Sequence, residues 1–597
     1  MSAFARFFVV ALAALAAAEP HLSPHVLHEK RAFAPEARGW RLSRRLEGHA
    51  ILPVKIGLTQ QNMHTIEDVL MAVSHLESPD YGKHWSAAQI SGIERSRLRL
   101  SVSKGWIQVK AAASEVENLL KAEYHVYEDE NGAERIGCSE YHIPQHLTSH
   151  IDLIKPTTAF GARVPPKKTR KRSLKSLSKR GETPEVVQQP TKLGSPSSFN
   201  GPKTDGRKVD GSTALGLEDC DESITPICLQ TLYNIHYTPV STKENTFAAG
   251  QKPVFISIDG GVAQTTNQSF NLSGESDLDL EYSTSLTAPQ PVQVLQTGDL
   301  IEGAGLDNWL DAVDASFCTF EGLSTVLSGD DPALPPNVVT VSYGQDEIIV
   351  SAKYAMRQCT EYAKIGLMGT TILYSSGDDG VAGIGGVCLT ENGTETTSGT
   401  RFNPSFPSGC PFVTSVGATQ VNPNSTVFQP EGACEQVIFS GGGFSNIFAI
   451  PSYQEESVEA FLKDHPPPFI GAQFNNSGTS RAFPDLTHCI NYIIAIDGEF
   501  KHAFGTSASA PTTGSIITFI NDARLAKGKG PVDASHSSFI NPAIYTAPFR
   551  AAFNDITQGG NQGCGTAGFT ATTGWDPVTG LGTPNFERLL ALWLLLP

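Results

Sequence analysis

The pattern of apolar and polar positions changes along the chain, and the change separates a small front region from a large region behind it. Between residues 19 and 154, strand-like runs such as ILPVKIGLTQ (51–60) alternate with helix-like runs such as TIEDVLMAVSHLE (65–77). This order predicts a ferredoxin-like α+β unit with the rhythm β-α-β-β-α-β. From about residue 213 to the end, short apolar strands such as NVVTVSYG (337–344) alternate with helix-like segments. They predict an α/β domain with a doubly wound parallel sheet.

Residues 155–212 follow neither pattern, because they are rich in Pro, Lys, Arg, Ser and Gly and poor in apolar side chains. Such a composition predicts a disordered linker. The linker contains KKTRKRSLKSLSKR (167–180), which is typical of a solvated basic linker, a localisation signal, or a processing site after Lys179 and Arg180.

The first stretch, MSAFARFFVVALAALAAAEP, has one Arg, an apolar run and small residues before Glu19. It predicts a signal peptide over residues 1–18, so the protein is expected to be secreted and extracellular. In a secreted chain the basic run favours processing, so residues 19–154 are expected to form a removable prosegment. The ten cysteines indicate disulfides, since no Cys-x-x-Cys pair occurs. Five sequons for glycosylation fit the same compartment: Asn267, Asn271, Asn392, Asn424 and Asn475.

Charge divides the chain at a similar place. Residues 1–200 carry 27 Lys and Arg against 20 Asp and Glu, whereas the remainder carries 17 against 41. The basic charge lies mostly on the linker and is not interleaved with aromatic residues, which argues against nucleic-acid binding. An inhibitory front segment that docks on an acidic body explains the asymmetry better. An acidic body also suits work at low pH, where protonation reduces self-repulsion.

The stretch AFGTSASAPTTG (503–514) is similar to the nucleophile turn of a serine peptidase and makes Ser507 a candidate nucleophile. A subtilisin-type domain would place its histidine upstream in a Gly-rich turn, and no histidine after residue 200 has that setting. His502 is close in sequence, but five extended residues span roughly 16 Å, too far for a hydrogen bond unless the chain doubles back. His488 is the other histidine considered as a base.

A carboxylate is the alternative proton acceptor. The acidic stretch SGESDLDLEYS (273–283) begins with a possible N-cap serine and places Glu275 and Asp279 on one helical face. Asp277 and Glu281 form a second pair on another face. An acidic first turn by itself indicates only a solvated helix end that complements the helix dipole.

The apolar strand in LYSSGDDGV (373–381) ends at Asp378, and functional groups gather at the carboxyl ends of strands in α/β sheets. An isolated Asp-Gly would indicate only a turn. Taken in order, the motifs SYGQDE, SSGDDGV, FPSGCPFVTSVGATQ, SGGGFSNIF, RAFPDLT, FGTSASAP and GWDPVTGLGTPNF resemble the sedolisins, the serine-carboxyl peptidases. In the front region, SPDYGKHWSAAQI (78–90) resembles that family's activation prosegment.

The resemblance implies a subtilisin-like fold for residues 213–597 and an acid peptidase. It implies that Glu275 is the general base for Ser507, that Asp279 tunes Glu275, and that Asp378 supplies the oxyanion hole. A carboxylate stays partly ionised at about pH 4, where imidazole is fully protonated, whereas Asp378 must be protonated to donate. The chain departs from the family at Asp379, where relatives usually have Ser.

The same resemblance implies one structural Ca²⁺ near the C-terminus. Asp555 and Asp576 lie in Gly-rich loops, and the resemblance adds the backbone carbonyls of Ile556, Thr572 and Gly574. Carboxylate and carbonyl oxygens are hard ligands that suit calcium. Without the resemblance, two turn aspartates would be the simpler interpretation.

The sequence leaves the specificity open. The favoured hypothesis is a tripeptidyl-peptidase that releases tripeptides from free N-termini, and the alternative is an endopeptidase with the same catalytic residues. An inactive subtilisin-like binding domain and a histidine-dependent serine hydrolase are the remaining interpretations. The expected partners are protein and peptide substrates and the chain's own prosegment as an intramolecular inhibitor. Nucleic-acid and membrane partners are not expected, and the protein is expected to be a monomer.

Overall fold

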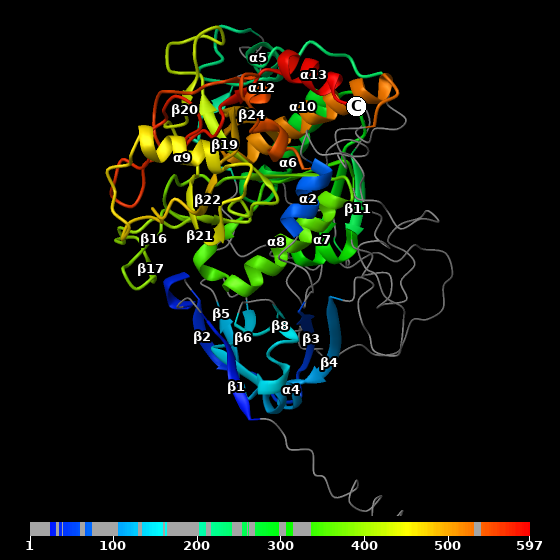
Figure 1. Ribbon diagram of the computed structural model, residues 1–597, viewed down its shortest axis with the longest axis vertical. Coiled ribbons are helices and arrows are strands. Elements are labelled where there is room, and N and C mark those ends of the chain that lie inside the picture. Colours follow the sequence, from blue (N-terminus) through cyan, green and yellow to red (C-terminus); the bar gives the residue numbers. More distant parts are fainter. Residues whose placement is uncertain are drawn as a thin grey trace, which may run out of the picture.

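The computed structural model describes residues 24–31, 35–38, 40–59, 66–74, 105–128, 134–158, 162–163, 202–209, 216–240, 253–258, 261, 269–297, 306–313, 336–530 and 539–597. The predicted signal peptide and the basic run 167–180 lie outside these residues. Figure 1 shows the sheets of the front region, in blue and cyan, below the large region. No helix in the described part of the chain is long and apolar enough to cross a membrane.

In its described residues the front region contains small antiparallel sheets and the α-helices α2 and α4. Strand β3 pairs with β4 on one side and with β8 on the other, and β5 lies between β2 and β6. Leu52 and Val54 of β3 are buried in one apolar core with Val116 and Leu120 of α4. The elements are β1 (His25–Lys30), β2 (Arg41–Arg45), β3 (Ile51–Leu58), α2 (Ile66–Ser74), β4 (Trp106–Ala112), α4 (Ala113–Leu120), β5 (Tyr124–Glu128), β6 (Glu134–Cys138), β7 (Glu140–Pro144), β8 (Ile151–Lys155) and β9 (Ala162–Arg163).

Helix α2 packs on the large region. Leu70 lies in a buried cluster with Ala363 and Leu367 of helix α8 (Ala352–Leu367), and Figure 1 shows α2 beside α8. The Glu67 carboxylate accepts a hydrogen bond from the Ser452 amide at 2.9 Å. The front region is therefore bound to the large one by apolar and polar contacts.

The large region is built around a mostly parallel sheet. Strand β15 lies between β13 and β19, and β23 runs parallel to β19, whereas the short β20 is antiparallel to it. The main strands are β11 (Val254–Ile258), β12 (Gln293–Thr297), β13 (Val338–Val341), β15 (Thr371–Ser375), β19 (Thr414–Gln420), β20 (Gly432–Ala433), β21 (Gly443–Ala449), β22 (Ser480–Phe483), β23 (Leu486–Cys489), β24 (Tyr492–Ile496) and β25 (Glu499–Ala503). The helices besides α8 are α5 (Pro226–Leu232), α6 (Phe270–Thr287), α7 (Leu306–Val313), α9 (Glu455–Asp464), α10 (Thr506–Ala526), α11 (Asn541–Ile544), α12 (Ala547–Arg550) and α13 (Phe586–Leu595).

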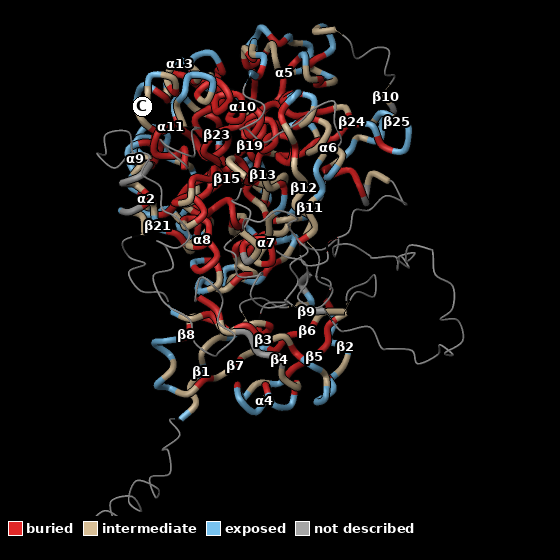
Figure 2. Tube along the Cα trace, turned by 90° about the vertical axis from the view of Figure 1, so that its right-hand side faces the viewer, coloured by how far each residue is buried: buried red, intermediate tan, exposed pale blue. Residues whose placement is uncertain are grey.

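Helices cover both faces of this sheet. Successive side chains of a strand point to opposite faces, so neighbouring residues of one strand pack against different helices. Leu373 of β15 packs into the same core as Ile516 of α10. Its neighbours Ile372 and Tyr374 pack instead with Tyr362 of α8. Figure 2 shows buried residues concentrated around β15, β19, β23 and α10. The prediction of an α/β domain with a mostly parallel sheet is confirmed.

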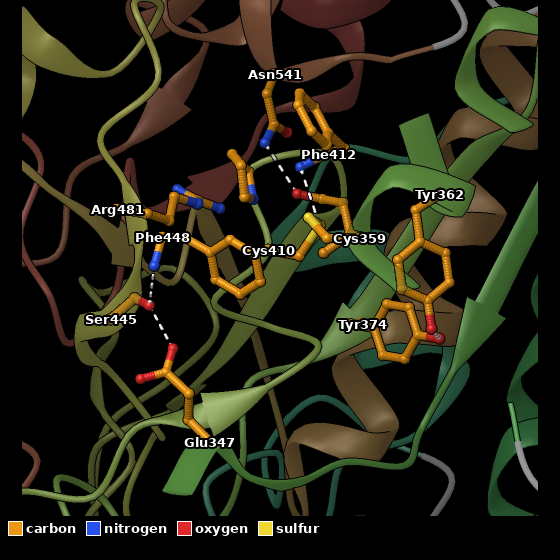
Figure 3. Close-up of a disulfide and its surroundings, with 12 residues drawn as sticks. Glu347, Cys359, Tyr362, Tyr374, Cys410, Phe412, Ser445, Phe448, Arg481 and Asn541 are labelled. Atoms are coloured by element: carbon orange, nitrogen blue, oxygen red, sulfur yellow. Dashed lines mark hydrogen bonds between the residues drawn. A yellow bond between two sulfur atoms is a disulfide. The ribbon is translucent and has the colours of Figure 1, made fainter. Parts of the chain in front are cut away.

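Disulfides fasten the large region. The bond between Cys359 and Cys410 joins α8 to the loop that precedes β19, as Figure 3 shows. In the same view, the Ser445 hydroxyl donates to the buried Glu347 carboxylate. The three bonds of the described residues are Cys220–Cys228, Cys359–Cys410 and Cys388–Cys564.

Three cysteines contradict the expectation that all ten form disulfides. Cys138, Cys434 and Cys489 are buried, and none of them is bonded to another described cysteine. Cys434 and Cys489 flank opposite sides of β19, because Thr419 pairs with both Ala433 and Cys489. Strands on either side of a third strand lie about 9 to 10 Å apart, which is too far for a disulfide.

The end of the predicted linker is bound to the large region. Strand β10 (Lys208–Val209) pairs antiparallel with Phe500 and Lys501 of β25. Lys203 forms an antiparallel bridge with Phe504. Residues 202–209 are therefore ordered, because an extended backbone can add to the edge of a strand whatever its side chains are.

Candidate active site

Helix α6 presents its two pairs of carboxylates to different surroundings. Glu275 is 8% exposed, and Asp279 lies one turn further along the helix. Asp277 is half-buried, while the Glu281 carboxylate accepts hydrogen bonds from the Ala495 amide. Helix α6 begins at Phe270 with Ser269 as its N-cap, so the sequence placed the N-cap one turn too late. The pair of Glu275 and Asp279 is the one that lies near Ser507.

Ser507 lies in the first turn of α10 and is 4% exposed. Its hydroxyl donates to the Ser342 carbonyl at 3.5 Å. The Ser342 hydroxyl donates to Asp279 Oδ1 at 2.9 Å and lies 3.1 Å from the Ser507 carbonyl. Ser342 therefore links the candidate nucleophile to the acidic pair. Sequence reasoning missed Ser342, although it directly follows β13, at the strand end where functional groups gather.

The Glu275 carboxylate is buried without a partner of normal hydrogen-bond geometry among the described residues. Burial raises its pKa well above the ordinary value and the Asp279 carboxyl raises it further, whereas the nearby hydroxyls of Ser507 and Ser342 lower it. Burial also raises the pKa of Asp279 to about 7. Hydrogen bonds of a catalytic group are often long before substrate binds. Glu275 is thus positioned as an acceptor beside Ser507.

Asp378 follows β15 and accepts hydrogen bonds from Thr506, the residue before Ser507. Its Oδ1 accepts from the Thr506 amide at 2.7 Å and from the Thr506 hydroxyl at 2.9 Å. Its Oδ2 would lie 3.1 Å from a Cβ added to Gly505, so a side chain there would crowd the carboxyl. Burial raises the pKa of Asp378 to about 6. The second carboxyl oxygen, which has no described hydrogen-bond donor, therefore lies beside the turn that carries Ser507.

The two histidines that could replace Glu275 lie elsewhere. His502 Nδ1 is 3.1 Å from Asp205 Oδ2, and its Nε2 is 2.9 Å from the Ser223 hydroxyl. His488 is fully buried, and its Nδ1 is 3.0 Å from the Thr513 hydroxyl. Burial lowers the pKa of His488 to about 3. Neither ring forms a hydrogen bond with Ser507 in the described part of the chain.

Hydrogen bonds connect four of the five expected calcium ligands near the C-terminus: Asp555, Thr572, Gly574 and Asp576. Asp576 is fully buried, and its carboxylate accepts from the amides of Thr572, Val578 and Thr579. Asp555 accepts from the Gly574 amide at 2.9 Å. Burial raises the pKa of Asp576 to about 7, and no described basic side chain forms an ion pair with it.

The buried Asp576, which has no described basic partner, and the exposed Asp555 offer hard oxygen ligands, so the residues present fit a hard cation. No group of three or more His, Cys, Asp or Glu side chains suited to a metal occurs among the described residues. A calcium ion there would therefore depend on backbone carbonyls as well as the two carboxylates.

The chain resembles known proteins along its length. Its front part matches the pro-kumamolisin activation domain over residues 38–95 and 89–160. It is 35% identical to aorsin of Aspergillus oryzae, with 96% of each chain covered. It is also 35% identical to tripeptidyl-peptidase sed1 of Aspergillus fumigatus, with 98% of each chain covered. The chain belongs to the sedolisin family.

A solved structure, the Pseudomonas sedolisin complexed with two molecules of pseudo-iodotyrostatin, is 20% identical to this sedolisin. The match has a TM-score of 0.45 and covers 62% of this chain and 98% of that one. Tripeptidyl-peptidase SED1 of Arthroderma otae is 32% identical, with 96% of this sedolisin and 97% of the relative covered. This sedolisin is therefore a peptidase with an activation prosegment, as its motifs predict.

Proposed function

We propose that this sedolisin is a secreted, acid-active tripeptidyl-peptidase in which Glu275 takes the proton of Ser507. One observation carries the proposal: the Ser507 hydroxyl lies beside a buried carboxylate, and no described histidine contacts it. The relatives named tripeptidyl-peptidase support the specificity. An endopeptidase of broad specificity is the alternative.

In the proposed reaction, Ser507 Oγ attacks the carbonyl carbon of a peptide bond while Glu275 accepts its proton. The same carboxyl then gives the proton to the leaving amine. Two buried carboxyls that share protons titrate as a pair, so that one can accept while the other stays protonated. Asp279 is the partner of Glu275, and Ser342 fixes the position of Asp279.

Asp378 is proposed to stabilise the oxyanion. Its Oδ1 already accepts two hydrogen bonds from Thr506, so the proton of the neutral carboxyl belongs on Oδ2, the oxygen beside Gly505. From there it can be donated to the oxyanion that develops when Ser507 attacks. Because the pKa of Asp378 is raised to about 6, the donor is present in acid and is lost as the pH rises through about 6.

The front region is proposed to be removed on activation, leaving a mature N-terminus between Gly181 and about Thr213. Until then residues 19–154, as a ferredoxin-like unit, would act as the intramolecular inhibitor of a monomeric, subtilisin-like domain. The position of residues 202–209 along β25 supports this, because β25 leads directly to Ser507. A calcium ion held by Asp555, Asp576 and the carbonyls of Ile556, Thr572 and Gly574 would stabilise the mature domain.

The test is digestion of a defined decapeptide at about pH 4, where the neutral Asp378 carboxyl is present as a donor. The peptide is offered with a free and with an acetylated N-terminus, and the products are identified by mass. Release of tripeptides from the free form alone would support the tripeptidyl-peptidase. Internal cuts in both forms would favour the endopeptidase. The absence of cleavage in both, equal to that of Ser507→Ala, would contradict a peptidase function.

A further inference from the structure

The chain's own segment 202–209 lies where a peptide could add to the active site. The Lys203 amide donates to the Phe504 carbonyl at 2.7 Å, and the Phe504 amide donates to the Lys203 carbonyl at 2.8 Å. Phe504 is three residues before Ser507. Pro202 would lie 3.6 Å from a Cβ added to Gly274, the neighbour of Glu275. The start of this segment, at Pro202 and Lys203, therefore lies close both to the helix that carries the base and to the backbone just before the nucleophile.

The side chain of Lys203 is bound at this place. Its ammonium donates to Asp379 Oδ1 at 2.8 Å and to the Asp378 carbonyl at 3.3 Å. The other carboxylate oxygen of Asp379 accepts from the Gly385 amide at 3.1 Å. The side chains of Lys203 and Asp379 are 30% and 16% exposed. A backbone amide thus fixes the carboxylate, and a second acceptor beside it completes a site for a cation.

We propose that Asp379 is a specificity-determining residue that selects Lys or Arg in a peptide substrate, at the position whose backbone pairs with Phe504. In the structure Lys203 occupies this position, so a substrate can bind there only after cleavage beyond Lys203 or displacement of segment 202–209. The proposal rests on the peptidase function proposed above.

The physical reason is the charge of a largely buried carboxylate. A substrate ammonium or guanidinium forms a charge-assisted hydrogen bond with it. An apolar side chain of similar length leaves the carboxylate without a cationic partner, and an acidic one repels it. If the pair of Lys203 and Asp379 were only structural, Asp379 substitutions would change stability without changing substrate preference.

The test uses activated enzyme and ten-residue peptides with free N-termini, in which one Lys, Arg, norleucine or Glu is moved along the peptide. The cleaved bond is identified by mass. We expect one fixed position, counted from the cleaved bond, at which Lys and Arg raise kcat/KM over norleucine by about 10- to 100-fold. Asp379→Asn and Asp379→Ser should reduce that ratio to within about threefold of one.

Asp277→Asn is the matched control, because it removes a carboxylate of α6 that has no described contact with segment 202–209 and should keep the ratio. The inference is overturned if the wild type cleaves peptides without a fixed preference for Lys and Arg, or if both Asp379 variants retain that preference. If no peptide is cleaved by the wild type, the proposed peptidase function itself is contradicted.

Discussion

Acidic side chains gather in two parts of this protein, the contact between the front and large regions and the active site, and the two parts treat them differently. At the contact, Arg357 of α8 pairs with Asp152 at 3.2 Å and with Glu361 at 3.0 Å. Lys155 of β8 pairs with Asp307. Each of these carboxylates is matched by a basic side chain.

The carboxylates of the active site lack such a basic partner. Glu275, Asp279 and Asp378 form no ion pair with a described basic side chain, and burial raises the pKa of all three. Lys203 lowers the pKa of Asp378 in part, but its ammonium is bonded to Asp379. A carboxylate paired with a cation thus holds two regions together, whereas neighbouring buried carboxyls without a cation share protons that they can exchange.

The largest effect is expected from Glu275→Gln, because glutamine has nearly the same shape but cannot accept and hold the serine proton. Turnover of a susceptible peptide at about pH 4 should fall by 10³-fold or more. Ser507→Ala should cause a similar loss, and both variants should keep the wild-type melting temperature within a few degrees. Substantial activity in Glu275→Gln would remove Glu275 from the mechanism.

The contact between the regions should weaken when Arg357 is truncated. Its guanidinium also donates to the carbonyls of Leu58 and Gly105 of the front region. Removing one partner of a buried ion pair costs about 3 to 5 kcal/mol. Arg357→Ala in the full chain should therefore raise amide hydrogen exchange in β3 and β8 at least about tenfold at neutral pH. Lys353→Ala, an exposed change on α8, is the control, and equal exchange in both variants would contradict the role of Arg357.

Asp279→Asn should move the acid limb of the pH profile. Burial and then the Asp279 carboxyl raise the pKa of Glu275, so removing that carboxyl lowers the pKa and leaves the base ionised at lower pH. The acid limb of kcat/KM should shift downward by about one pH unit. An unchanged or upward-shifted limb would show that Asp279 does not tune Glu275.

Buried carboxyls without cations also predict how stability depends on pH. Burial raises the pKa of Glu431 from 4.5 to about 7. A carboxyl whose pKa is higher in the folded than in the unfolded protein stabilises the fold. This stabilisation is fully present below the pKa of the unfolded protein and is lost as the pH rises through the pKa of the folded protein. The melting temperature should therefore fall by several degrees between about pH 4.5 and 7. Glu431→Gln should reduce the fall and the exposed Glu459→Gln should not, and a temperature that rises over this interval would contradict the account.

The smallest effect concerns calcium. A ligand that binds only the folded state at a concentration 100 times its Kd adds about 2.7 kcal/mol of stability. Chelation should lower the melting temperature of the mature domain by about 2 to 4 °C. Asp576→Ala should abolish this difference. A chelation shift that persists in Asp576→Ala would exclude the proposed site.

The sequence was sufficient for much of the fold, because β13, β15 and α8 are continuous apolar or amphipathic runs. It also selected Glu275, Asp378 and Ser507, because each stands in a short motif. Ser342 could not be selected in this way, since its link to Asp279 exists only after β13 and α6 have packed. The unpaired Cys434 and Cys489 were missed for a similar reason, because strand order decides which cysteines can meet.

The pairing of Lys203 with Asp379 depends on a segment that composition alone assigned to a disordered linker. Residues 202–209 are ordered by backbone hydrogen bonds to Phe504 and β25. Such bonds do not depend on the residue type, so the composition could not predict them. The departure from the family at Asp379 was visible in the sequence. The role proposed for Asp379 could be inferred only from the structure, which places the Lys203 ammonium against its carboxylate.

The pH dependence of kcat/KM in the wild type and in His502→Ala tests the central claim, that a carboxylate and not an imidazole accepts the proton of Ser507. His502 contacts Asp205 and Ser223, so its removal should leave turnover at about pH 4 within a few-fold of the wild type and should not move the acid limb. A wild-type profile that disappears as imidazole becomes protonated, together with an inactive His502→Ala, would contradict the account.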